Sequence, residues 1–236
     1  MREGREQIKN LAKSAAMVAL LIAVQFALSV IPGVELVTVL LLVFSYTAGA
    51  RWGMLTATAF SLLRCILFGF SPTAVTLYLI YYNVFAGTFG VLGKRGVRSF
   101  WVCPVVLAVL LLFCAYFAAT GIPTSVLYQR RIQVMLWGLF ALLCAVFVGY
   151  FFLLFYGKKR GEEWKEVASV VAFATLFTVC FTLLDDVITP LFFRYTADAA
   201  LAYFYASFFA MIPQAVCTVV SVATLFLPLR KIFKIA

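Results

Sequence analysis

The chain has 236 residues, of which 65% are hydrophobic and only 12% are charged, and its mean hydropathy is +1.08. This composition excludes an ordinary soluble domain and predicts an all-α polytopic membrane protein. The chain has no histidine, which excludes Ser-His-Asp and Cys-His catalysis and histidine metal sites.

Eight segments are apolar for long enough to be read as membrane spans, each about 20 residues. Breaks rich in glycine, proline or charge separate them, among them Pro32-Gly33, Ser71-Pro72 and Thr189-Pro190. The second and third spans are joined by a very tight turn between Gly49 and Gly53. The predicted spans are 11–31, 34–50, 52–70, 73–93, 100–120, 132–156, 167–190 and 199–228.

The distribution of basic residues predicts the orientation of these spans. If the N-terminus is cytoplasmic and the spans alternate, only Arg130, Arg131 and Arg194 fall outside, and Arg64 falls within a span. All other lysines and arginines then lie at cytoplasmic ends, as the positive-inside rule requires. The net charge of +10 is therefore a topology signal, with anionic lipid headgroups rather than nucleic acid as its partner, and both termini are expected in the cytoplasm.

The first span carries a stripe of small residues. Ala15, Ala19 and Ala23 recur every four residues and so lie on one helix face. Such a face lets another helix approach closely in lipid. The stripe alone leaves open whether that helix belongs to a partner or to this chain.

The second and third spans each bring one charged residue to their predicted outer end. Glu35 opens the second span, where it is either a binding residue or a simple interfacial residue. Arg64 lies in "FSLLRCILFGFSPT", about 8 Å below the outer end of the third span at 1.5 Å per residue. A charge at this depth is costly unless it finds a partner. Arg64 could reach the outer headgroups, pair with Glu35 or Asp185, or contact a ligand.

Other polar residues of the spans also fall mostly in the outer half. Tyrosine belts are common at membrane interfaces, but three of the fourth-span residues lie deeper than a belt requires. Gln214 follows Pro213 and could bind a ligand or only compensate for the lost backbone bond. An outward-facing cavity explains this asymmetry best. The candidate substrate-binding residues are Glu35, Arg64, Tyr78, Tyr81, Tyr82, Asn83, Asp185, Tyr203 and Gln214.

Motifs for catalysis are missing from the sequence. There is no GxxxxGK[ST], GxSxG or HExxH, and Asp185-Asp186 lacks the further aspartate of a DDxxD magnesium site. Neither enzymatic activity, a cofactor nor a metal is therefore predicted, and a transporter would take its energy from an ion gradient or a partner.

The stretch "IPGVELVTVLLLVFSYTAGARWGMLTATAFSLLRCILFGFSPTAVTLYLIYYNVFAGTFGVLGKRG", after the alanine-striped first span, resembles a known family. It is similar to the substrate-binding S-components of energy-coupling factor (ECF) vitamin transporters, as is the last stretch "YFYASFFAMIPQAVCTVVSVATLFLPLRKIF". The resemblance covers residues 1–98 and 166–236 of what we expect to be a single transmembrane domain. S-components have six helices, so residues 99–165 would add an extra helix pair.

The resemblance implies a multi-pass protein of a bacterial-type plasma membrane. It would capture a vitamin-like micronutrient outside with high affinity and dock through Ala15, Ala19 and Ala23 on a transmembrane coupling subunit. Two cytosolic ATPases would then drive the uptake. Two other interpretations stay open, namely a gradient-driven transporter that works alone and a membrane assembly subunit that transports nothing.

Overall fold

The structure is a computed structural model that describes residues 2–31, 35–95, 102–121, 126–158 and 162–235. These residues form eight α-helices and no strand, which confirms the predicted all-α architecture. Six of the helices are long and apolar enough to cross a membrane, and the six do not include α2 and α3. The helices are α1 (Arg2–Leu28), α2 (Val37–Ala48), α3 (Ala50–Phe68), α4 (Pro72–Arg95), α5 (Val102–Thr120), α6 (Val126–Lys158), α7 (Glu162–Phe192) and α8 (Ala197–Ile235).

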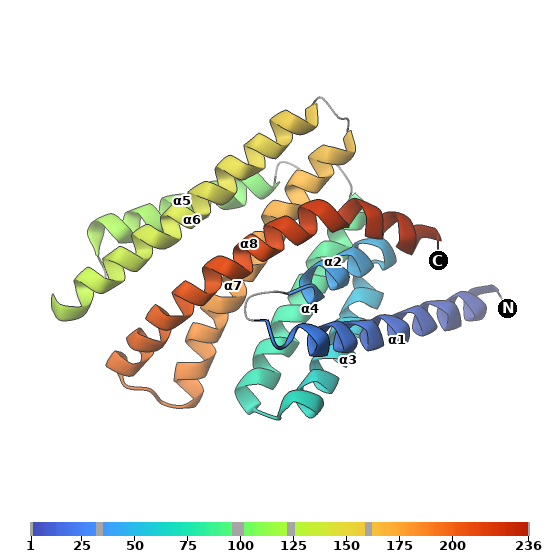
Figure 1. Ribbon diagram of the computed structural model, residues 1–236, viewed down its shortest axis with the longest axis horizontal. Helices are drawn as coiled ribbons and strands as arrows, with labels where there is room; N and C mark the ends of the chain where they lie inside the picture. The colour runs from blue at the N-terminus through green and yellow to red at the C-terminus, as the bar shows by residue number, and fades with distance from the viewer. Residues whose placement is uncertain (1, 32–34, 96–101, 122–125, 159–161, 236) are drawn as a thin grey trace.

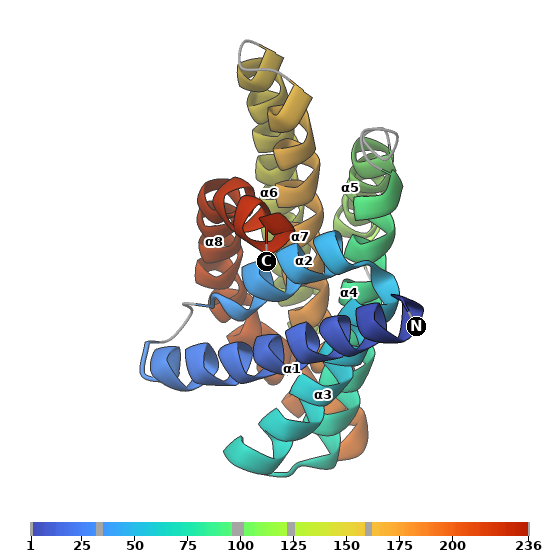
Figure 2. The ribbon, with the colours of Figure 1, turned by 90° about the vertical axis from the view of Figure 1, so that its right-hand side faces the viewer.

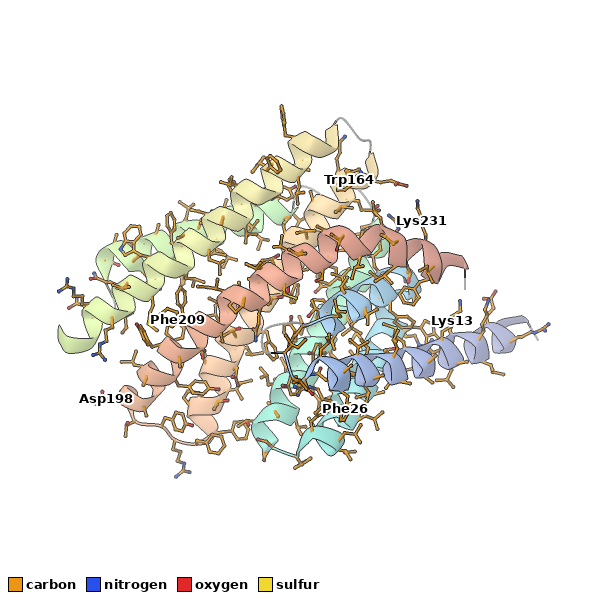
Figure 3. All side chains as sticks on the ribbon, in the orientation of Figure 1. Lys13, Phe26, Trp164, Asp198, Phe209 and Lys231 are labelled. Carbon is orange, nitrogen blue, oxygen red and sulfur yellow. The ribbon has the colours of Figure 1, made fainter. Side chains whose placement is uncertain are left out.

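The helices run back and forth between two ends of the molecule (Figure 1). One end, called here the terminal end, carries both chain termini, and Lys13 and Lys231 lie toward it (Figure 3). The opposite end, called here the distal end, carries the turns at 69–71 and 193–196 and the start of α6. Asp198 lies at this distal end (Figure 3).

The short helix α2 forms the centre of the N-terminal half. All ten residues from Val37 to Tyr46 are buried, and α2 packs against α1, α3, α4 and α8. A helix that is buried all round needs no polar face, which explains why this segment is almost wholly apolar. Figure 2 shows α1 lying across the surface of this half, outside α2 and α3.

A glycine turn joins α2 to α3, as predicted. Gly49 has φ +89°, a left-handed conformation that favours glycine. Side chains at Gly90 and Gly93 of α4 would collide with the backbone of Ala50 and Tyr46 on either side of this turn. The glycines of "GTFGVLGK" therefore let α4 pack closely against it.

The helices α5 and α6 form a hairpin at the flank of the bundle. They pack against each other and against α7, and lie apart from α1–α4 (Figure 1). This is where an added helix pair can sit without disturbing the rest. One predicted break is displaced by two residues: α7 continues through Pro190 to Phe192, although the proline nitrogen cannot donate the helix hydrogen bond to residue 186.

Candidate functional site

Arg64 lies in the last turns of α3, toward the distal end, and stacks on an aromatic ring. Its guanidinium carbon is 3.8 Å from the ring centroid of Tyr78 on α4 and 5.9 Å from that of Phe68. Its Nε atom is buried and has no hydrogen-bond partner among the described residues. The arginine is therefore held in place by cation–π contact while part of its hydrogen-bonding capacity is unused.

Glu35 lies just before α2, close enough to Arg64 for their charges to attract. Its backbone is fixed against α8: the Glu35 amide donates to Cys217 Sγ at 3.4 Å, and the Cys217 thiol donates to the Glu35 carbonyl at 3.7 Å. Gln214 precedes Cys217 by three residues and so lies on the same side of α8. Three elements, α2, α3 and α8, thus bring Glu35, Arg64 and Gln214 toward one region.

An aromatic wall stands behind Arg64. Tyr78 stacks on Tyr82 and on Phe181 of α7, with ring centroids 5.7 and 5.8 Å apart. Tyr81 meets Phe181 edge-on at 4.7 Å, and Tyr81 and Tyr82 are both buried. The wall is thus a closely packed group of aromatic rings with the planar cation of Arg64 stacked on Tyr78.

Asp185 and Tyr203 form a neighbouring pair between α7 and α8. The Tyr203 hydroxyl donates to Asp185 Oδ2 and the Thr189 hydroxyl donates to Oδ1, both at 2.7 Å. Asp186 accepts a bond from Ser207 through Oδ2 at 2.8 Å, whereas its Oδ1 is buried without a hydrogen-bond partner among the described residues. Asp185 is also close enough to Tyr78 for its negative charge to act on the Tyr78 hydroxyl.

Asn83 is turned away from this cluster. Its side-chain oxygen accepts a bond from Thr58 of α3 at 2.9 Å, and its nitrogen donates to the Leu79 carbonyl at 2.8 Å. The bond from Thr58 links α4 to α3, the bond to Leu79 lies within α4, and together they use both ends of the amide. Asn83 thus makes the contacts of a helix-packing residue, as do Asp185 and Tyr203, which bond to each other across α7 and α8.

The alanine stripe of α1 is exposed. Ala15, Ala19 and Ala23 all face outward, whereas Ser14, Met17, Val18 and Leu21 are buried beneath α1. The helix therefore packs on α2 and α3 with its other face. The stripe therefore does not pack against another helix of this chain, which was one of the two roles that the sequence left open.

A second polar cluster, which the sequence analysis missed, lies near the terminal end. Glu166 at the start of α7 accepts bonds from the Tyr46 hydroxyl of α2 and from Arg230 near the end of α8. The Arg230 guanidinium carbon also lies 5.5 Å from the Tyr46 ring centroid. The pattern of apolar runs does not predict this cluster, because Arg230 and Glu166 resemble the ordinary charged residues that flank membrane spans.

Comparisons with protein-family models, with curated proteins and with solved structures find no match to this chain.

Proposed function

We propose that this chain is the substrate-capture subunit of an ECF-type importer in a bacterial-type plasma membrane. In this proposal all eight helices cross the membrane, both termini are cytoplasmic, and the distal end faces outward. The chain captures a vitamin-like micronutrient there and delivers it through a coupling subunit and two cytosolic ATPases.

The observation that carries the proposal is the state of Arg64. A charged side chain within a span is retained when it has a partner, and a buried donor without an acceptor costs free energy. Arg64 has a buried Nε without a partner among the described residues, stacks on the ring of Tyr78 and is close enough to Glu35 for their charges to attract. A ligand with a flat ring and an acceptor at its edge would satisfy that donor and stack on the same wall.

The exposed alanine stripe supports the second half of the proposal. A lipid-facing helix gains nothing from alanine, since larger apolar residues are tolerated equally well there. Small residues at Ala15, Ala19 and Ala23 are useful where another helix must approach closely. A coupling subunit that docks on α1 fits this requirement.

The flanking position of the α5–α6 hairpin also fits the proposal. If these two helices are an addition to a six-helix core, they must attach without entering the binding region. The hairpin packs on α7, away from α3 and α4, which carry Arg64 and Tyr78. Capture at the distal end of α3, α4 and α7 can therefore proceed without it.

The deciding experiment is mass spectrometry of small molecules that co-purify with the protein, followed by uptake assays in vesicles. We expect a ring-containing micronutrient to be bound, and uptake that requires ATP and the coupling module. Uptake by the chain alone that an ionophore abolishes would instead identify a gradient-driven transporter. A chain that retains no ligand and supports no uptake would be an assembly subunit.

A further inference from the structure

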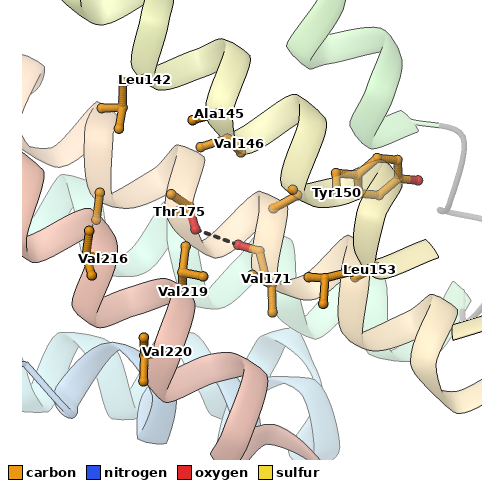
Figure 4. A pocket seen from close by; sticks show the side chains of 14 residues that line it. Leu142, Ala145, Val146, Tyr150, Leu153, Val171, Thr175, Val216, Val219 and Val220 are labelled. Atoms are coloured by element: carbon orange, nitrogen blue, oxygen red, sulfur yellow. Dashed lines mark hydrogen bonds between the residues drawn. The ribbon is translucent and has the colours of Figure 1, made fainter. Parts of the chain in front are cut away.

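Two cavities lie between α6 and α8, which diverge from each other while both pack on α7 (Figure 1). The larger has a volume of about 760 Å³ and lies at the distal end, where both helices begin. Its lining includes Arg130, Arg131, Asp198 and Tyr205. The smaller, about 210 Å³, lies further along the same seam, with α7 as its floor (Figure 4). Neither cavity is lined by Arg64 or its neighbours.

The smaller cavity is suited to hydrocarbon. Side chains such as Leu142, Val146, Val216 and Val219 form its walls (Figure 4). The hydroxyl of Thr175 already donates to the Val171 carbonyl at 2.9 Å, so it needs no hydrogen bond from a molecule bound in the cavity. No atom lies within 4 Å of where a Cβ on Gly149 would stand, so this part of α6 borders open space.

One exposed stripe of α8 connects the two cavities. It begins at Tyr205 in the larger cavity and ends at Val216 and Val220 in the smaller one, with Phe209 and Ile212 between them. The steps of four, three, four and four residues place all five on one helix face. Their exposed fractions lie between 41% and 57%, and Phe209 points out from α8 (Figure 3).

The facing helix contributes to the same path. On α6, Val134 lines the larger cavity, and Trp137 one turn further is 50% exposed. Beneath this path the ring of Phe208 meets α6 so closely at Gly138 that any added Cβ would collide with it. The two helices thus touch through Phe208, and the apolar path runs over that contact.

The larger cavity has the charge for an anionic group. Arg130 and Arg131 are both exposed on its wall, and Asp198 is the one acidic side chain among the described residues that line it. The N-terminal ends of α6 and α8 add their own partial positive charge there. These arginines are two of the three basic residues that the predicted topology places outside, so the charge rule does not account for them.

We propose that the seam between α6 and α8 binds an anionic phospholipid. Its headgroup lies at Arg130 and Arg131, and one acyl chain follows the α8 stripe into the smaller cavity. Arg131 and Leu142 are about 16 Å apart along α6, at 1.5 Å per residue. This is about half of a hydrocarbon core of about 30 Å, so one chain of ordinary length spans it. The inference does not depend on what Arg64 binds.

The test uses quenching of tryptophan fluorescence by brominated lipids. A variant that keeps only Trp137 is reconstituted into phosphatidylcholine vesicles in which a minor fraction is brominated phosphatidylglycerol or brominated phosphatidylcholine. We expect half-maximal quenching at about a tenfold lower fraction of the anionic lipid, because two arginines attract its headgroup. The Arg130→Gln/Arg131→Gln variant is expected to lose this preference, and Arg194→Gln, at the same end, to keep it.

A second variant tests the acyl chain separately from the headgroup. Gly149→Leu extends a side chain into the smaller cavity, and we expect it to weaken quenching by long-chain phosphatidylglycerol severalfold while short-chain phosphatidylglycerol is unaffected. Equal quenching by both headgroups in the parent protein, or a preference that survives the double arginine change, would overturn the proposal. No quenching by either lipid would show that something other than lipid covers the stripe. Circular dichroism checks that each variant is folded.

Discussion

At the scale of single residues, Arg64 decides what the distal cluster can bind. We expect Arg64→Ala to weaken binding of the co-purifying micronutrient at least tenfold, which is over about 1.4 kcal/mol. The reason is that the variant loses the cation that stacks on Tyr78 and attracts Glu35. Calorimetry with the identified ligand measures the change, with Arg194→Ala as the matched control. Unchanged affinity would mean that Arg64 contacts the lipid headgroups and not the ligand.

The cluster of Tyr46, Glu166 and Arg230 makes a second residue-scale prediction. Arg230→Met leaves Glu166, whose side chain is 14% exposed, without its counter-charge. We expect this to lower the free energy of unfolding by about 1–3 kcal/mol, measured by thermal unfolding in detergent. Adding Glu166→Met should cost less than it does in the parent, since the stranded carboxylate is then removed. Strictly additive losses would show that the two side chains do not act together.

The depth of site residues along the helices could be predicted from the sequence, but their rotation about the helix axes could not. The distances along the chain from each break place Glu35, Arg64 and Asp185 at one level, and in the structure Glu35 is close enough to Arg64 for their charges to attract. Asn83 has a suitable depth yet points to Thr58, because packing of α4 on α3 decides its direction. Glu166 and Arg230 are 64 residues apart and meet only through tertiary packing.

At the scale of helices, close backbone packing explains two glycines of α4. A methyl group at Gly90 would collide with Ala50, so we expect Gly90→Ala to lower the free energy of unfolding by about 1–3 kcal/mol. Gly149→Ala is the matched control, because its added methyl meets no atom within 4 Å. Alanine is also the better helix former, so this variant should be neutral or slightly more stable. Equal losses in both variants would point to a general intolerance of change.

The exposed face of α1 makes a separate prediction at this scale. Ala19→Trp should abolish uptake by the assembled importer while leaving ligand affinity unchanged, since Ala19 is exposed on the face of α1 that points away from α2 and α3. Leu20→Trp changes an exposed neighbour that points away from the stripe and should retain uptake. Parallel measurements of ATP-dependent uptake and ligand binding decide the matter. Loss of both functions in Ala19→Trp would contradict a docking role.

At the scale of the whole molecule, the open question is whether the α2–α3 hairpin crosses the membrane. The twelve residues of α2 span about 18 Å, less than a hydrocarbon core of about 30 Å. Yet the turn at Gly49 lies beside Lys94 at the end of α4, a helix long enough to cross on its own. A turn that reaches the same level as the end of α4 requires α3 to run the same distance in the opposite direction.

We therefore expect the turn to be cytoplasmic, and a cysteine scan of a cysteine-free variant tests this. Arg51→Cys and Lys94→Cys should react with a membrane-impermeant maleimide only after the cells are permeabilised. Ser71→Cys and Thr196→Cys, in the two distal turns, should react in intact cells. Labelling of Arg51→Cys in intact cells, with Lys94→Cys still protected, would mean that α2 and α3 enter the membrane from outside and return. In that case α2 and α3 would form a re-entrant loop with Glu35 and Arg64 still at its outer end, so capture from outside would not require the hairpin to cross the membrane.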